Sequence, residues 1–164
     1  MAIKNIICAV IAVCAYSFSY SQKISVNQMN VSWEFQQDSI VFEADAPDDG
    51  WIALGFNSKN DIVGSNLIMV NVINGKASAE DFFVVSAGNP RPVEEFDVKP
   101  QVSKVSGTES NGQTKVRFSL PVKASDTYHF NLQKGHEIWL ICAYSMEDEF
   151  DHHSRMRKHV KIEL

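Results

Sequence analysis

The sequence predicts a single all-β sandwich, and three features of the chain predict it. In several short stretches apolar and polar residues alternate with a period of two, which is the pattern of a strand with one buried face. Turn-forming residues separate these stretches roughly every ten residues. No window of about 11 residues has the apolar spacing of an amphipathic helix. Short strands joined by regular turns, without helices, are typical of a β-sandwich.

The first half of the chain predicts five strands, at residues 31–35, 40–44, 51–56, 67–73 and 82–85. The first two alternate apolar with polar residues, as a strand with one solvent-facing side does. The next two are almost continuously apolar, as expected where both faces of a strand are covered. The dipeptide Asn74-Gly75 predicts a tight hairpin before the fifth strand, because both central residues of a type I′ turn need positive φ.

The second half of the chain predicts one long loop and four more strands. Residues 86–100 contain three prolines and three acidic residues, which indicate a surface loop. Strand patterns follow at residues 102–105, 116–120, 138–144 and 160–164, with a break at residues 107–112. Cys142 lies in the most apolar of these stretches, so we expect its thiol to be buried and inert.

Residues 1–21 have the pattern of a secretory signal peptide. Lys4 supplies the positive charge, residues 6–15 form an apolar run, and the small residues Ser19 and Ser21 precede a cleavage site before Gln22. The apolar run is too short to cross a bilayer, for which about 20 residues are needed. We therefore expect residues 22–164 to form one mature domain without a transmembrane segment, secreted or periplasmic.

The charge and the motifs narrow the class of function. The chain has 15 Lys and Arg against 20 Asp and Glu, a formal net charge of −5. This balance argues against binding to nucleic acid or to an anionic membrane, since both require a clustered positive field. The sequence has no nucleophile elbow, no HExxH motif and no phosphate-binding glycine loop, so we expect a binding protein rather than an enzyme.

Three stretches, in order along the chain, resemble the DOMON domain family. They are residues 50–57 with 62–66, the pair Asn74-Gly75 with residues 81–83, and residues 138–144 followed by His153 and Arg157. The resemblance extends over nearly all of residues 22–164. It implies an immunoglobulin-like β-sandwich of about nine to eleven strands and an extracytoplasmic ligand-binding role. Some members of the family hold a b-type haem between a Met and a His and pass electrons to a partner, and others are thought to bind sugars.

The resemblance implies a haem site in which His153 is the iron ligand. Arg157 follows it at the right spacing to pair with a haem propionate, because guanidinium offers a planar fork of donors to a carboxylate. Ile62 stands where the family has its ligating Met, and Asn66 replaces the acidic residue that follows. Met69 could supply a thioether instead, although Met is also a common core residue. Haem b held by His153 alone, or by His153 with another sixth ligand, is therefore the expected cofactor.

The sequence leaves other binding functions open, and most of them involve other residues. A carbohydrate site needs an aromatic face and planar hydrogen-bonding groups, and residues of these types are Trp51, Asn57, Trp139 and Tyr144. Trp51 and Trp139 lie in apolar runs, where a core position is also expected. A metal cluster of His152, His153 and His159 lacks any familiar zinc spacing. A protein-interaction module without a redox role is the remaining alternative.

Overall fold

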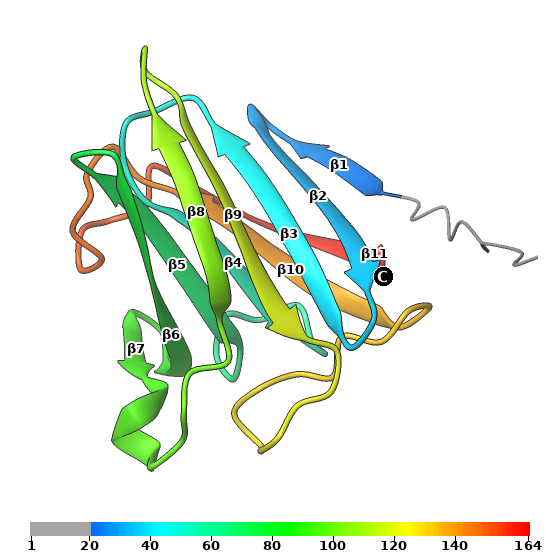
Figure 1. Ribbon diagram of the computed structural model, residues 1–164. Helices are drawn as coiled ribbons and strands as arrows, with labels where there is room; N and C mark the ends of the chain where they lie inside the picture. Colours follow the sequence, from blue (N-terminus) through cyan, green and yellow to red (C-terminus); the bar gives the residue numbers. More distant parts are fainter. Residues whose placement is uncertain (1–20) are drawn as a thin grey trace, which may run out of the picture.

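The computed structural model describes residues 21–164 and shows two antiparallel sheets packed face to face (Figure 1). The elements are β1 (Gln22–Val26), β2 (Met29–Gln36), β3 (Ser39–Ala46), β4 (Ile52–Asn57), β5 (Asn66–Ile73), β6 (Lys76–Ser86), β7 (Asn89–Pro92), the 3-10 helix η1 (Val93–Phe96), β8 (Ser103–Glu109), β9 (Thr114–Pro121), β10 (Glu137–Tyr144) and β11 (Met156–Glu163). The predicted sandwich of about nine to eleven strands is confirmed. The predicted signal peptide, apart from Ser21, lies outside the described residues.

The two sheets contain five and six strands. The first has the order β1-β2-β3-β9-β8, and the second has the order β11-β10-β4-β5-β6-β7. Asn74 and Gly75 have φ values of 53° and 74° in the turn between β5 and β6, as the hairpin prediction requires. Among residues 21–164, no helix has the length and the hydrophobicity needed to cross a bilayer.

The main hydrophobic core lies between the two sheets. Val31 and Trp33 of β2 point into it, and the residues between and beside them are only partly buried, which confirms the predicted alternation. Phe42 packs against Phe118 of the same sheet, with ring centroids 5.7 Å apart, and against Phe56 of the opposite sheet at 5.1 Å. Such aromatic pairs contribute about 1 kcal/mol each beyond the area that they bury.

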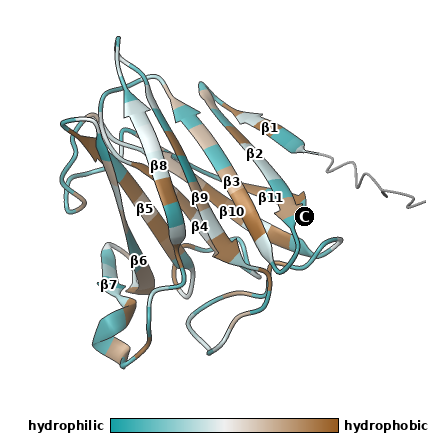
Figure 2. Cartoon of the chain, viewed as in Figure 1, coloured by the Kyte–Doolittle hydropathy of each residue, from teal (hydrophilic) through white to brown (hydrophobic). Residues whose placement is uncertain are grey.

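The strands β4 and β5 do not alternate between buried and exposed residues. All six residues of β4 are buried, and so are the first seven of β5. Figure 2 shows β5 as hydrophobic along most of its length, whereas β8 is mostly pale, which marks intermediate hydropathy. One face of β4 and β5 lies against the core, so the other face must be covered by loops rather than by the second sheet.

The sequence prediction missed two short edge strands and misplaced one break. β7 lies within residues 86–100, which were predicted as loop; its prolines are tolerated because it is an edge strand. β1 was missed because Val26 is its only fully buried residue. β8 continues through Gly107 to Glu109, although Gly107 was predicted as part of a break. Glycine is suited to this position because a Cβ there would lie only 2.8 Å from the Lys115 carbonyl oxygen on β9. Cys142 is buried as predicted, and burial raises the pKa of its thiol to about 12.

A buried histidine fastens the loop between β9 and β10 to the rest of the domain. His129 Nε2 lies 3.1 Å from Asp81 Oδ2, and its Nδ1 lies 2.8 Å from Asp126 Oδ1. Asp81 also accepts hydrogen bonds from Asn66 Nδ2 at 2.6 Å and from the Gln101 backbone N–H at 2.9 Å. Both ring nitrogens of His129 therefore face carboxylates, which is the environment of a protonated imidazole.

The charges of this network set the pKa values of two of its members. Burial alone would lower the pKa of His129, but the hydrogen bonds and charges of Asp81 and Asp126 outweigh burial and raise it. Burial alone would raise the pKa of Asp126, but hydrogen bonds from His129, the Tyr128 backbone and Ser125 outweigh burial and lower it.

We predict that His129→Gln destabilises the protein most at mildly acidic pH. The raised pKa of His129 adds stability below its ordinary value of about 6.5, and this contribution is lost as pH rises through the folded-state pKa. The lowered pKa of Asp126 adds stability that is lost only when pH falls below about 4. Urea unfolding should show a loss of about 3 kcal/mol near pH 5.5 and a smaller loss near pH 9.

The exposed His136 provides the control for this measurement. His136→Gln should change the free energy of unfolding by less than about 0.5 kcal/mol at either pH. A loss on His129→Gln that is the same at pH 5.5 and pH 9 would contradict the charged network.

Candidate functional site

The outer face of the six-stranded sheet is hollowed where its side chains are small. Ala53 of β4 pairs with Ala143 of β10 on one side and with Met69 of β5 on the other. The same row continues to Arg157 on β11 and to Glu80 on β6. Directly paired residues of antiparallel strands share a face of the sheet. Two methyl groups therefore lie between a guanidinium and a thioether, and they leave space above the sheet.

Loops cover this hollow and close it into a pocket of about 550 Å³. The covering segments are the loop that carries Ile62, the turn between β6 and β7, and residues 150–154 after β10. Phe150 packs edge-on against Phe82 of β6, with ring centroids 6.3 Å apart. Leu67 and Val84 add to the apolar lining. The volume falls within the range of about 300–1,000 Å³ that is common for small-molecule sites.

The loop after β10 is fixed to the start of β4 by backbone hydrogen bonds. The Trp51 N–H donates to the Glu147 carbonyl at 3.1 Å, and the Ser145 N–H donates to the Trp51 carbonyl at 3.0 Å. Gly50 permits this approach, because a Cβ at that position would lie 2.6 Å from Glu147 N. Further along the loop, Ser145 Oγ donates to the His153 carbonyl at 3.0 Å. The segment that carries His153 is thus held against the sheet.

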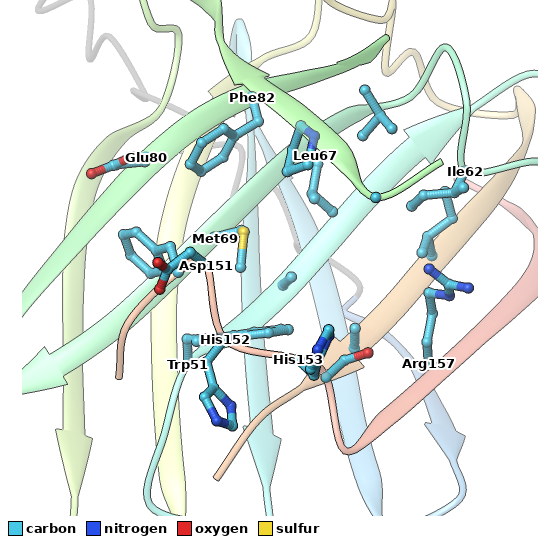
Figure 3. A pocket seen from close by; sticks show the side chains of 18 of the residues that line it. Trp51, Ile62, Leu67, Met69, Glu80, Phe82, Asp151, His152, His153 and Arg157 are labelled. Carbon is cyan, nitrogen blue, oxygen red and sulfur yellow. The ribbon is translucent and has the colours of Figure 1, made fainter. Parts of the chain in front are cut away.

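The structure brings together the three residues that the sequence linked to haem. His153, Met69 and Arg157 all line the pocket, and Figure 3 shows them on the loop after β10, on β5 and on β11. Met69 is 3% exposed, whereas His153 and Arg157 are exposed at the edge of the pocket. Among residues 21–164, no carboxylate lies within ion-pair distance of Arg157. His152 also lines the pocket, with its ring centroid 6.2 Å from that of His153.

Ile62 also lines the pocket, on a tightly bonded loop. Asn57 Nδ2 donates to the Asp61 carbonyl at 2.7 Å and to the Val63 carbonyl at 3.1 Å. Ser65 Oγ donates to the Ile62 carbonyl at 2.7 Å. These bonds hold the side chain of Ile62 at the pocket. Ile62 occupies the position at which the family resembled by the sequence has its ligating Met, and an aliphatic side chain cannot coordinate iron.

The four residues considered for a sugar site do not share one location. Trp51 lines the pocket, whereas Tyr144 lies in the core between the sheets. Asn57 is 3% exposed and organises the Ile62 loop. Trp139 lies on β10 between Asn57 and Lys161, outside the pocket lining. Asn57 is therefore a residue that shapes the pocket without facing it.

The described residues contain no group of three or more His, Cys, Asp or Glu side chains placed to hold a metal ion. His159, which the sequence grouped with His152 and His153, instead lies with Nδ1 3.0 Å from Asn60 Oδ1. Burial, together with the charge of Arg157, lowers the pKa of His159. The three histidines therefore do not form a cluster.

Sequence reasoning missed the small residues of the pocket floor and most of its walls. The missed residues include Ala53, Ala143, Glu80, Phe150 and Asp151. A signal for the floor was present in residues 51–56, where the large side chains of Ile52, Leu54 and Phe56 alternate with Ala53 and Gly55. A strand that is large on one face and small on the other can pack its large face in the core and border a cavity with its small face.

Comparison with known proteins identifies the fold and the family. The model of the DOMON domain matches residues 25–145, which confirms the family resemblance over that range; His153 and Arg157 lie beyond it. The cytochrome b domain of pyranose dehydrogenase from Coprinopsis cinerea is similar in structure, with a TM-score of 0.65 and 9% identity over 86% of this chain and 80% of that one. The cytochrome domain of Myriococcum thermophilum cellobiose dehydrogenase gives a TM-score of 0.58 and 10% identity, over 89% and 82% of the two chains.

We predict that Asn57→Ala loosens the Ile62 loop. The substitution leaves the carbonyls of Asp61 and Val63 without their donor, so the free energy of unfolding should fall by about 1–3 kcal/mol. Hydrogen exchange of the Gly64 and Ser65 amides should accelerate more than exchange in β9. Ser58→Ala, on the same loop but exposed, is the control and should change neither quantity. Unchanged exchange in Asn57→Ala would show that the loop is held by other contacts.

Proposed function

The chain belongs to the DOMON family, and on that premise we propose that residues 22–164 form an exported module that holds a b-type haem without a covalent bond. Its role is to carry electrons to a partner outside the cytoplasm, rather than to catalyse a reaction. The observation that carries the proposal is the pocket itself, which collects an imidazole, a thioether and an unpaired guanidinium around an apolar floor. The predicted leader at residues 1–21 would direct its export.

The chemistry of the pocket residues fits a haem. Neutral imidazole and thioether are both known axial ligands of haem iron, and His153 and Met69 supply one of each. The methyl side chains of Ala53 and Ala143 leave space above the sheet for a planar ring system. The guanidinium of Arg157 offers a fork of donors to a propionate at the rim.

Each group of residues has a separate task in this proposal. When bound, the haem would supply reversible one-electron chemistry. Ile62, Leu67 and Phe82 exclude water from the pocket, and a dry, apolar surrounding favours the less charged state of a bound group. Met69 would offer its thioether to the iron, and such a ligand would favour reduced iron and raise the reduction potential. The fixed loop holds His153 in place, which limits reorganisation around the site.

The solved domains of similar fold support haem over sugar. Both are described as cytochrome domains of dehydrogenases, and a cytochrome domain carries haem. The residues considered for a sugar site add less support, because Trp51 is the only one of the four that lines the pocket. A carbohydrate or another small ligand is the alternative occupant that the experiment below distinguishes.

We predict that the purified protein binds added haemin and develops a Soret band that shifts on reduction with dithionite. His153→Ala should abolish the band, because it removes the imidazole that would bind the iron. Met69→Leu should retain haem but lower its reduction potential. Arg157→Gln should weaken haemin binding about tenfold, the effect of losing one charged hydrogen bond. Absorption titration and potentiometry measure these quantities.

Two further variants test whether the pocket is the site. His152→Ala is the matched control for His153→Ala, since both imidazoles line the pocket, and it should keep the Soret band. Ala53→Leu fills the pocket without removing a donor and should abolish binding while the fold persists. Ser110→Leu adds the same side chain at the exposed turn between β8 and β9, away from the pocket, and should have no effect. A wild-type protein that takes up no haemin would overturn the haem proposal and favour the alternative ligands.

A further inference from the structure

The pocket floor carries opposite charges at its two ends. Arg157 on β11 begins a row of paired residues that crosses the sheet, and Glu80 on β6 ends it. The residues between them are Ala143, Ala53 and Met69. The row spans four strand intervals, so the Cα atoms of Arg157 and Glu80 lie about 19 Å apart. Both side chains line the pocket.

Asp151 adds a second carboxylate to the β6 end of the pocket. The segment that carries it crosses the pocket, because Phe150 packs on Phe82 of β6 and the Arg155 backbone N–H donates to a carbonyl at the end of β10 at 2.8 Å. Asp151 directly follows Phe150, so it lies toward β6. Figure 3 shows it on the opposite side of the pocket from Arg157.

These three charges have no counter-ion in the part of the chain that the structure describes. There, neither Glu80 nor Asp151 lies within ion-pair distance of a basic side chain, and Arg157 has no acidic partner. The other titratable groups of the pocket lining are the imidazoles of His152 and His153. A bound ligand therefore meets a positive end near β11, a negative end near β6 and apolar side chains between them.

We propose that Glu80 and Asp151 determine the selectivity of the pocket by repelling carboxylates on the edge of the ligand that faces β6. The inference rests on the proposed haem function. Haem b carries its two propionates on adjacent pyrrole rings, so its negative charge is confined to one edge, which faces Arg157. Its vinyl groups lie on the other two rings and face β6. Contacts between like charges are a common means by which a binding site rejects the wrong partner.

The test compares haemin with iron coproporphyrin III, which has propionates in place of both vinyl groups. Absorption titration at low ionic strength measures the two dissociation constants. In the wild type haemin should bind more tightly. In the double variant with Glu80→Gln and Asp151→Asn, the ratio of the two dissociation constants should fall at least about fivefold, because the affinity for iron coproporphyrin III rises. The wild-type ratio should also fall in about 1 M salt, since both carboxylates are exposed and salt screens them.

A second double variant is the matched control. Asp38→Asn with Glu163→Gln removes the same charge from exposed positions outside the pocket lining, and it should keep the wild-type ratio. Gln and Asn have nearly the shapes of Glu and Asp. The larger size of iron coproporphyrin III therefore affects the wild type and both variants alike, and a change in the ratio reports charge.

The outcomes separate this inference from the haem proposal. If the wild type binds haemin but binds iron coproporphyrin III equally well, or if the ratio is unchanged in the pocket variant, the role of Glu80 and Asp151 is refuted and the haem function stands. An equal fall in both double variants also refutes it, because the cause is then the net charge of the protein. If the wild type binds neither porphyrin, the haem function fails and the inference fails with it. A fall confined to the pocket variant establishes both carboxylates as determinants of selectivity.

Discussion

The structure depends on one constraint: the central strands of the six-stranded sheet are apolar on both faces, but the second sheet can cover only one. β4 and β5 are buried over nearly their whole length. Their inner face packs in the core, and the outer face would otherwise expose Leu67 and Met69 of β5 to water. Loops must therefore fold over that face, because exposed apolar area of this kind is costly. The pocket is what remains when the loops cover a face whose central side chains are methyl groups.

The covering loops are held by a few specific bonds rather than by a second core. The segment after β10 is fastened to Trp51 by a pair of backbone hydrogen bonds, and Gly50 allows the close approach. The Ile62 loop is held by the amide of Asn57. Outside the pocket lining, His129 joins the loop between β9 and β10 to Asp81, which also bonds Asn66 at the start of β5. The Ile62 loop and the segment after β10 are thus each anchored to a strand beneath them.

The fold was predictable from the sequence because its signals are local. Alternation, turn residues and the Asn74-Gly75 pair fix the strands without knowledge of their neighbours. The edge strands β1 and β7 were missed because they bury too little to show a pattern. The candidate site was predictable only in part. His153 and Arg157 were predicted by resemblance and Met69 as a thioether in the strand after Ile62, and all three line the pocket, whereas the role of Asn57 depends on a loop geometry that spacing does not reveal.

Two properties of the site come from different parts of the fold. The paired alanines of the floor set its width, and the connecting segments supply several of its other side chains. Strand pairing sets the spacing of Ala53 and Ala143, so the width available to an occupant belongs to the rigid scaffold. The imidazole of His153 and the aliphatic side chain of Ile62 come from connecting segments, which tolerate substitution more easily than strands do. Related chains can thus diversify in the ligand that they bind by altering those segments, while the width set by the paired strands is kept.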